Sequence, residues 1–212
     1  MDVRLIGITR FLESPDGHPQ GLLEHAGRVC YRSTKRGEPG RFLQNRIREG
    51  HESIIEHASL TFEVSGISRA CSHQLVRHRL ASYSQESQRY VDMSNAQWVR
   101  PPTIAANPEA LALWEQALAG LRDAYRSLRE LGIPKEDARY LLPNAAQTRL
   151  VVTMNLREIR HVCRLRITRE AQWEIREVAI RMLRLAHEVA PDVFADLWEE
   201  LTREHPDWFL TG

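Results

Sequence analysis

The feature that most constrains the fold is a polar segment near the middle of the chain, RHRLASYSQESQRY at residues 77–90. It holds three arginines, a histidine and several hydroxyl-bearing side chains, but Glu86 is its only acid. A buried guanidinium must be paired with acceptors, and one carboxylate cannot satisfy three of them. The segment is therefore predicted to line a site, while the core is built from other parts of the chain.

This composition is typical of a site for phosphates and a nucleobase. Arginine binds phosphate in a bidentate manner, and serine and glutamine side chains hydrogen-bond the polar edges of a base. A solvated basic surface is the alternative. Lys35 and Lys135 are the only lysines among 29 basic residues, a bias that fits anion recognition and equally fits a GC-rich genome.

The rest of the chain predicts a single α+β domain over residues 1–212, with a small antiparallel or mixed sheet packed against helices. A chain of 212 residues with 42% hydrophobic and 27% charged residues can bury one sizeable core. Hydrophobic periodicity predicts strands over residues 2–11, 59–65 and 148–155. It predicts helices over residues 20–32, 39–49, 67–79, 108–131, 135–142, 156–166, 172–190 and 191–203.

Two local signals add detail. Asn107 before Pro108 is a helix N-cap, and Gly132 is a helix stop, so the apolar stripe between them is expected to be core or subunit interface. The segment STKRGEPG around residue 36 is predicted to be a loop.

The cysteines and the hydropathy exclude several classes of protein. Cys30, Cys71 and Cys163 are widely spaced and form no C-x-x-C pair, so neither a disulfide framework nor a cysteine zinc site is indicated. Cys163 is expected to pack in a helix and not to act as a nucleophile. The sequence has no apolar run of about 20 residues and no signal-peptide pattern, which predicts a cytoplasmic protein without membrane contact.

A second polar cluster, GHESIIEH at residues 50–57, contains two histidines six positions apart. On a helix these side chains point about 120° apart, unlike the H-E-x-x-H arrangement, so no metal is expected. The cluster is interpreted as the wall of a site or a cap before the next strand. No G-x-G-x-x-G or P-loop motif occurs, so the phosphates of any bound dinucleotide must be met by side chains.

Four ordered motifs resemble a known family. Arg77-His78-Arg79, then seven residues, then Ser87 is similar to the signature of the flavin-dependent thymidylate synthases. GHESIIEH, SYSQESQRY, ARYLLP at residues 138–143 and LRITREAQWEIR at residues 165–176 support the resemblance over nearly the whole chain. It implies conversion of dUMP to dTMP with 5,10-methylenetetrahydrofolate, NADPH and FAD, in an α+β homotetramer with active sites at subunit interfaces.

The resemblance also implies site residues. The flavin-binding set is Ser53, Arg77, His78, Arg79, Gln85, Asn155 and His161. The dUMP-binding set is Gln74, Leu75, Val76, Arg77, Gln85, Glu86, Ser87, Gln88, Arg89, Arg139 and Arg166. Three positions depart from the family pattern: Gln85 stands where many relatives have Glu, His161 where some have Asn, and Glu170 where some have His.

The implied catalytic residue is Arg166. The uracil ring becomes nucleophilic at C5 as its N3 proton is lost, and arginine is too weak a base to remove that proton. A fixed guanidinium beside N3 instead stabilises the anionic ring.

Two other classes compete with this interpretation. A nucleic-acid-binding module would use residues 77–90 as a phosphate face, but the chain's formal charge is only +1. A metal hydrolase would use His51, His57, His73 and His78, whose spacing suits a metal poorly.

Overall fold

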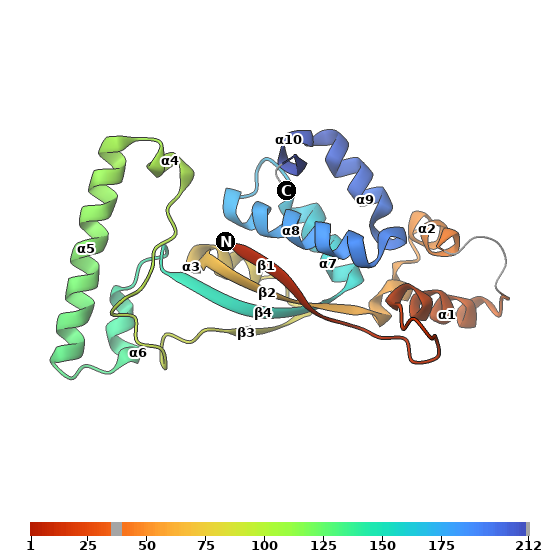
Figure 1. The fold of residues 1–212 in the computed structure, drawn as a ribbon, viewed down its shortest axis with the longest axis horizontal. Coiled ribbons are helices and arrows are strands. Elements are labelled where there is room, and N and C mark those ends of the chain that lie inside the picture. The colour runs from red at the N-terminus through yellow and green to blue at the C-terminus, as the bar shows by residue number, and fades with distance from the viewer. Residues whose placement is uncertain (35–39, 211–212) are drawn as a thin grey trace. The chain divides into compact units, whose positions relative to one another are not determined.

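A computed structural model describes residues 1–34 and 40–210 and shows an α+β fold (Figure 1). Its strands are β1 (Asp2–Ile8), β2 (Ser59–Ser68), β3 (Ala81–Gln85) and β4 (Gln147–Asn155). Its α-helices are α1 (Pro19–Tyr31), α2 (Arg41–Arg48), α3 (Arg69–Leu75), α4 (Pro102–Ala105), α5 (Pro108–Glu130), α6 (Lys135–Ala138), α7 (Leu156–Arg166), α8 (Trp173–Val189), α9 (Pro191–Glu204) and α10 (Pro206–Phe209). Two 3-10 helices are η1 (Glu52–His57) and η2 (Arg139–Leu141). Most of the loop predicted around residue 36 lies outside the described residues.

The four strands form one sheet in the order β1-β2-β4-β3. The start of β2 meets the residue after β1, where Thr9 N donates to Ser59 O at 3.0 Å. The residue after β3 meets β4 near its start, where Glu86 N donates to Arg149 O at 3.0 Å. Pairing of a strand end with a neighbour's start makes the sheet antiparallel, one of the two forms predicted.

The chain divides into two compact units, each built from separate segments. The α5 unit comprises residues 1–2, 65–76 and 84–150, and the α7 unit comprises residues 3–64, 77–83 and the described residues from 151 onward. The prediction of a single domain over residues 1–212 stays a prediction. No helix among the described residues has the length and apolar character that crossing a membrane requires.

In the α5 unit the long helix begins as predicted. Asn107 Oδ1 accepts hydrogen bonds from the backbone of Glu109 and Ala110, and Gly132 follows the helix with a φ of +84° that favours glycine. Tyr125 is buried and its hydroxyl accepts from Met93 N at 3.2 Å. Leu131, in contrast, is 77% exposed, so the apolar stripe of α5 is only partly core within the chain.

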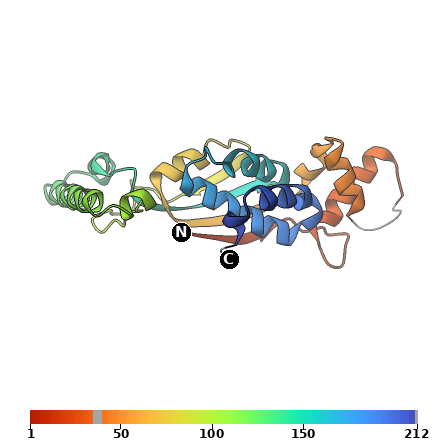
Figure 2. The same ribbon diagram turned by 90° about the horizontal axis from the view of Figure 1, so that it is seen from above.

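In the α7 unit alternate residues of the strands face a core formed with helices. Leu60, Phe62 and Val64 are fully buried, whereas Thr61 on the other face shares a hydrogen bond of 2.9 Å with Thr153. Figures 1 and 2 show α8 and α9, in blue, over one face of the strands. The helices supply further fully buried residues, including Ile159, Val162, Cys163, Val178, Leu183 and Phe194.

A buried ion-pair network ties α7 to its neighbours. Arg160 is fully buried, and its guanidinium donates two hydrogen bonds of 2.7 Å to the carboxylate of Asp196 on α9. Its Nε lies 3.5 Å from Glu52 Oε1 on η1, and Glu52 also lies within 4 Å of Arg157 and Arg164. Because a buried cation must be paired, this network determines how η1, α7 and α9 pack.

The predicted helix over residues 67–79 is wrong at both ends, because Ile67 and Ser68 belong to β2 and α3 stops at Leu75. Ser68 caps α3 at its start by accepting from Cys71 N at 3.0 Å, and the chain turns at Val76 and Arg77. Arg77 and Arg79 are exposed on either side of buried His78, in an irregular segment that precedes β3. Strand β3, which follows, was not predicted because its polar residues give little hydrophobic signal.

Replacing Asp196 with alanine is expected to lower the free energy of unfolding by about 1.5 to 3 kcal/mol, the range for a hydrogen bond to a charged group. The loss arises because the buried Arg160 guanidinium keeps only its other contacts. Urea unfolding at fixed protein concentration measures it. The control is Glu177→Ala, which removes an exposed ion pair with Arg181 and should change stability by less than about 0.5 kcal/mol. Equal effects of the two substitutions would contradict the prediction.

Candidate functional site

A buried imidazole lies at the centre of the polar cluster in the α7 unit. His78 is 5% exposed, and its Nε2 accepts a hydrogen bond of 3.1 Å from Nε of Arg166, the last residue of α7. Glu158 Oε1 lies 3.9 Å from His78 Nδ1, and the His161 ring packs edge-on at 6.1 Å between centroids. The Tyr83 hydroxyl donates to His78 O at 3.0 Å and holds the main chain.

Helix α7 positions three of these side chains. Asn155 caps it, accepting from Glu158 N at 2.8 Å, which places Glu158 in the first turn. His161, three residues later, projects from nearly the same face. The helix ends at Arg166, so one element brings an acid, an imidazole and a guanidinium to His78.

The hydrogen bond from Arg166 decides the protonation of His78. Arginine only donates, so the Nε2 atom that accepts from it carries no proton. Burial, the Arg166 charge and His161 lower the pKa of His78 to about 4, and the imidazole is neutral at pH 7. The 3.9 Å approach of Glu158 is therefore not an ion pair at neutral pH. Burial also raises the pKa of Glu158.

Arg77 and Arg79 give this cluster a cationic exterior. Both are exposed, and within the described parts of the chain neither side chain makes a hydrogen bond or an ion pair. Two unpaired guanidiniums beside a buried histidine are suited to phosphate oxygens. The exposed side chains of Ser53 on η1 and His161 on α7 belong to the same unit. These residues fit a phosphate-bearing cofactor such as FAD.

The α5 unit holds most of the predicted dUMP set. Ser87 forms a turn, in which its Oγ accepts from Arg89 N at 3.3 Å. Glu136 then joins two arginines: its carboxylate accepts from Arg89 Nε at 3.1 Å, and its carbonyl accepts from Arg139 Nε at 3.1 Å. The turn and these cations form a second group suited to a phosphate.

The remaining members of the predicted sets have different surroundings. Gln85 donates to Thr148 Oγ1 at 3.2 Å, and Gln74 donates to Ala70 O at 3.5 Å. Leu75 is fully buried. Val76 and Gln88 are partly buried. The α7 unit contains Ser53, Arg77, His78, Arg79, Asn155, His161 and Arg166, and the α5 unit contains Gln74, Leu75, Val76, Gln85, Glu86, Ser87, Gln88, Arg89 and Arg139.

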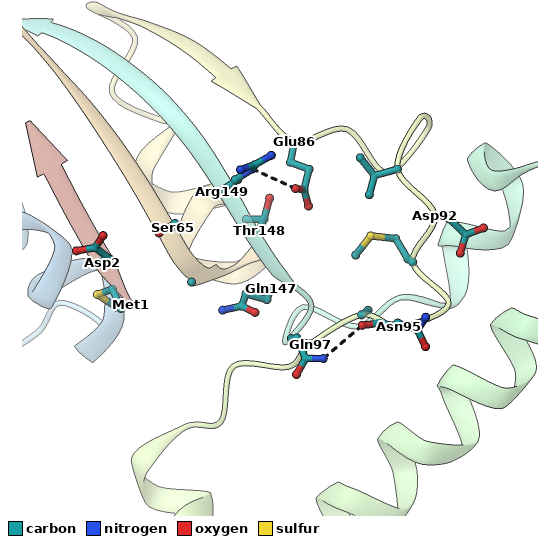
Figure 3. A pocket seen from close by; sticks show the side chains of 14 residues that line it. Met1, Asp2, Ser65, Glu86, Asp92, Asn95, Gln97, Gln147, Thr148 and Arg149 are labelled. Atoms are coloured by element: carbon teal, nitrogen blue, oxygen red, sulfur yellow. Dashed lines mark hydrogen bonds and ion pairs between the residues drawn. The ribbon is translucent and has the colours of Figure 1, made fainter. Parts of the chain in front are cut away.

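The α5 unit also has a pocket of about 520 Å³ (Figure 3). Glu86 is the one member of the predicted sets that lines it, and it lies 3.4 Å from Arg149 Nε. Met1, Ser65, Asp92, Asn95, Gln97 and Gln147 are among the other lining residues. No sequence motif indicated this pocket, because its walls come from segments far apart in the chain.

Two expectations about other side chains can be compared with the structure. Cys163 is fully buried in α7, and burial raises the pKa of its thiol to about 12, which suits packing and not nucleophilic attack. Among the described residues, no three His, Cys, Asp or Glu side chains are grouped as metal ligands. Sequence reasoning missed Glu158 and Tyr83, because an acid in the first turn of a helix and a strand tyrosine are common structural features.

Comparison with known proteins gives consistent matches. The sequence model of the family described as thymidylate synthase complementing protein matches residues 12–192. A flavin-dependent thymidylate synthase of Geobacter sulfurreducens is 46% identical over 194 residues, covering 86% of this chain and 83% of that protein. The protein of that name from Nitratidesulfovibrio vulgaris is 44% identical over 199 residues, covering 84% and 81%. Its counterpart in Mycobacteroides abscessus is 40% identical over 222 residues, covering 92% and 88%.

The pKa of His78 predicts how stability depends on pH. The folded-state pKa of about 4 lies below the ordinary value of 6.5, so the unfolded chain binds more protons between these values. The contribution of His78 to stability is complete above pH 6.5 and is lost as the pH falls towards 4. Unfolding measured from pH 7 to pH 4 should show a weaker pH dependence in His78→Gln than in the wild type. Parallel curves would exclude a depressed pKa at this residue.

Proposed function

The chain belongs to the flavin-dependent thymidylate synthase family, and from this we propose that it is a methyltransferase converting dUMP to dTMP. The one-carbon donor is 5,10-methylenetetrahydrofolate, and NADPH supplies electrons through FAD. The observation that carries the proposal is the match over residues 12–192, together with relatives of 40% to 46% identity over more than four fifths of the chain.

The α7 unit is proposed to bind FAD. Arg77 and Arg79, whose guanidiniums have no partner among the described residues, are assigned to its phosphates. The other assigned flavin contacts are Ser53, His78, Gln85, Asn155 and His161. His78 contributes through its backbone and by holding Arg166, because its imidazole is buried. The bound flavin supplies the redox chemistry that no side chain can perform.

The turn at Ser87 is proposed to bind the phosphate of dUMP. Arg89 and Arg139 share Glu136 as a partner, so this acid keeps both cations near the turn without neutralising both. The remaining assigned nucleotide contacts are Gln74, Leu75, Val76, Arg77, Gln85, Glu86, Gln88 and Arg166.

Arg166 is the proposed catalytic residue. Its Nε–H donates to neutral His78, and we assign to this hydrogen bond the role of setting the plane of the guanidinium. A fixed cation beside the N3 edge of uracil stabilises the anionic ring and raises the nucleophilicity of C5. C5 would then bond to the folate methylene carbon as the bond from that carbon to a folate nitrogen breaks. Loss of the C5 proton and a hydride supplied by reduced FAD, when bound, would complete the methyl group.

We further propose a cytoplasmic homotetramer with active sites at subunit interfaces. Large apolar side chains remain exposed in both units: Ile6 and Ile8 on β1 are 48% and 51% exposed, and Leu113 and Leu131 at α5 are 70% and 77% exposed. Ile6 and Ile8 lie on the same face of β1, and a contiguous apolar patch of this kind is typical of a surface that a second subunit covers. Light scattering of the purified protein measures the assembly.

The function is tested with the purified, FAD-loaded protein. After anaerobic reduction by NADPH, addition of dUMP and 5,10-methylenetetrahydrofolate should reoxidise the flavin and yield dTMP. The visible flavin spectrum reports the redox change, and chromatography identifies the product. Folded protein that takes up neither FAD nor dUMP would refute the proposal.

Arg166→Ala is expected to lower kcat about a hundredfold to a thousandfold, the usual effect of removing one preorganised donor to developing negative charge. FAD binding should persist, because the phosphates are assigned to Arg77 and Arg79. Arg164→Ala is the matched control: this arginine lies on the same helix but pairs with Glu52 and Asp196. Near-normal turnover in Arg166→Ala would remove Arg166 from the mechanism.

A further inference from the structure

We propose that Glu158 is a positioning residue, which acts through His78 to orient the guanidinium of Arg166. The inference rests on the proposed function, in which Arg166 acts on the pyrimidine. It adds an acid that the family resemblance did not indicate. Glu158 and His78 are both 5% exposed, so their interaction is shielded from bulk water.

The hydrogen-bond chain has a defined direction. Arg166 Nε donates to His78 Nε2 at 3.1 Å, so Nε2 must offer its lone pair. A neutral imidazole with an unprotonated Nε2 carries its proton on Nδ1. Glu158 Oε1 lies 3.9 Å from Nδ1, which is longer than a hydrogen bond. A small movement of the carboxyl group would bring this oxygen within hydrogen-bond distance of the Nδ1 proton.

The other groups around His78 have different contacts. Tyr83 on β3 donates to the carbonyl of His78 and therefore holds its main chain. His161 on α7 packs edge-on against the ring, at 76° between the planes. Among these described neighbours, Glu158 is the one whose carboxyl oxygen lies near Nδ1, where an acceptor would select the tautomer that Arg166 requires.

Loss of that acceptor has a clear consequence for Arg166. The imidazole can then move its proton to Nε2, where it would oppose the Nε–H of Arg166 and displace the guanidinium. Electrostatic stabilisation requires a donor held in a fixed orientation. The proposed action of Arg166 therefore depends on the His78 contact that holds its guanidinium in place. A competing structural role is available to Glu158, since an acid in the first turn of α7 interacts favourably with the helix dipole.

Two substitutions separate these roles. Glu158→Gln keeps a carbonyl acceptor but loses the charge, whereas Glu158→Leu loses both. If Glu158 acts through His78, Glu158→Gln should retain a kcat within about threefold of the wild type. Glu158→Leu should lower kcat about tenfold to hundredfold, as loss of a residue that orients a functional group does. KM for dUMP should change little in either variant. If the helix dipole explains Glu158, Glu158→Gln and Glu158→Leu should behave alike, and the proposal fails.

The tautomer of His78 gives a readout that does not depend on turnover. Imidazole ¹⁵N chemical shifts of the labelled, FAD-loaded protein should show the Nδ1–H form in the wild type and in Glu158→Gln, and a substantial Nε2–H population in Glu158→Leu. Glu24→Gln is the control, because it changes another buried acid of the same unit, which pairs with Arg28 at 2.7 Å. An unchanged tautomer in Glu158→Leu would overturn the proposal. If Glu158→Leu does not fold, Glu158→Asp replaces it, because the shorter side chain carries the carboxyl group farther from His78. Glu158→Asp should then show a smaller rise in the Nε2–H population of His78. A wild-type tautomer together with a wild-type kcat in Glu158→Asp would overturn the proposal.

Failure of this inference is distinguishable from failure of the proposed function. If the wild type forms no dTMP, or Arg166→Ala turns over normally, the function assigned to Arg166 is wrong. If Arg166→Ala is impaired while Glu158→Leu keeps normal kcat, only the positioning role is wrong. In the double variant Glu158→Leu/Arg166→Ala, single-turnover rates should match those of Arg166→Ala alone, because the effect of Glu158 passes through Arg166.

Discussion

The buried guanidinium of Arg160 is the constraint on which the α7 unit depends. A cation without solvent contact is tolerated only when acceptors surround it, and here they come from Asp196 on α9 and Glu52 on η1. Few placements of α7 satisfy both acids at once. Since the same helix carries Glu158, His161 and Arg166, the pairing that secures the fold also places the polar cluster around His78.

In that cluster a partly buried guanidinium meets a neutral imidazole. Arg166 Nε donates a hydrogen bond of 3.1 Å to His78 Nε2, and His78 is neutral at pH 7. Burial and the Arg166 charge together keep the imidazole unprotonated. Arg77 and Arg79, exposed on either side of His78, remain on the outside of the cluster, where phosphate oxygens can replace water.

Much of the secondary structure was predictable, because its signals are local. Asn107 and Gly132 bound α5 through caps formed within a few residues, and the alternation Leu60, Phe62, Val64 marks a half-buried strand. Prediction failed where local signals compete with tertiary contacts. Helical spacing continues past Leu75, yet the helix stops there, and His78 is buried between two exposed arginines in an irregular segment. The polar residues of β3 become a strand only by pairing with β4.

The sequence by itself determined the chemical types available: arginines in excess of acids at residues 77–90, motifs similar to those of a flavoenzyme family, and helices that begin and end at recognisable caps. Only the tertiary structure decided which of these groups meet. Arg166 and His78 are 88 positions apart, and Arg160 and Asp196 are 36 apart. No local periodicity encodes such pairs, because they form when separate elements pack and each buried polar group must find a partner.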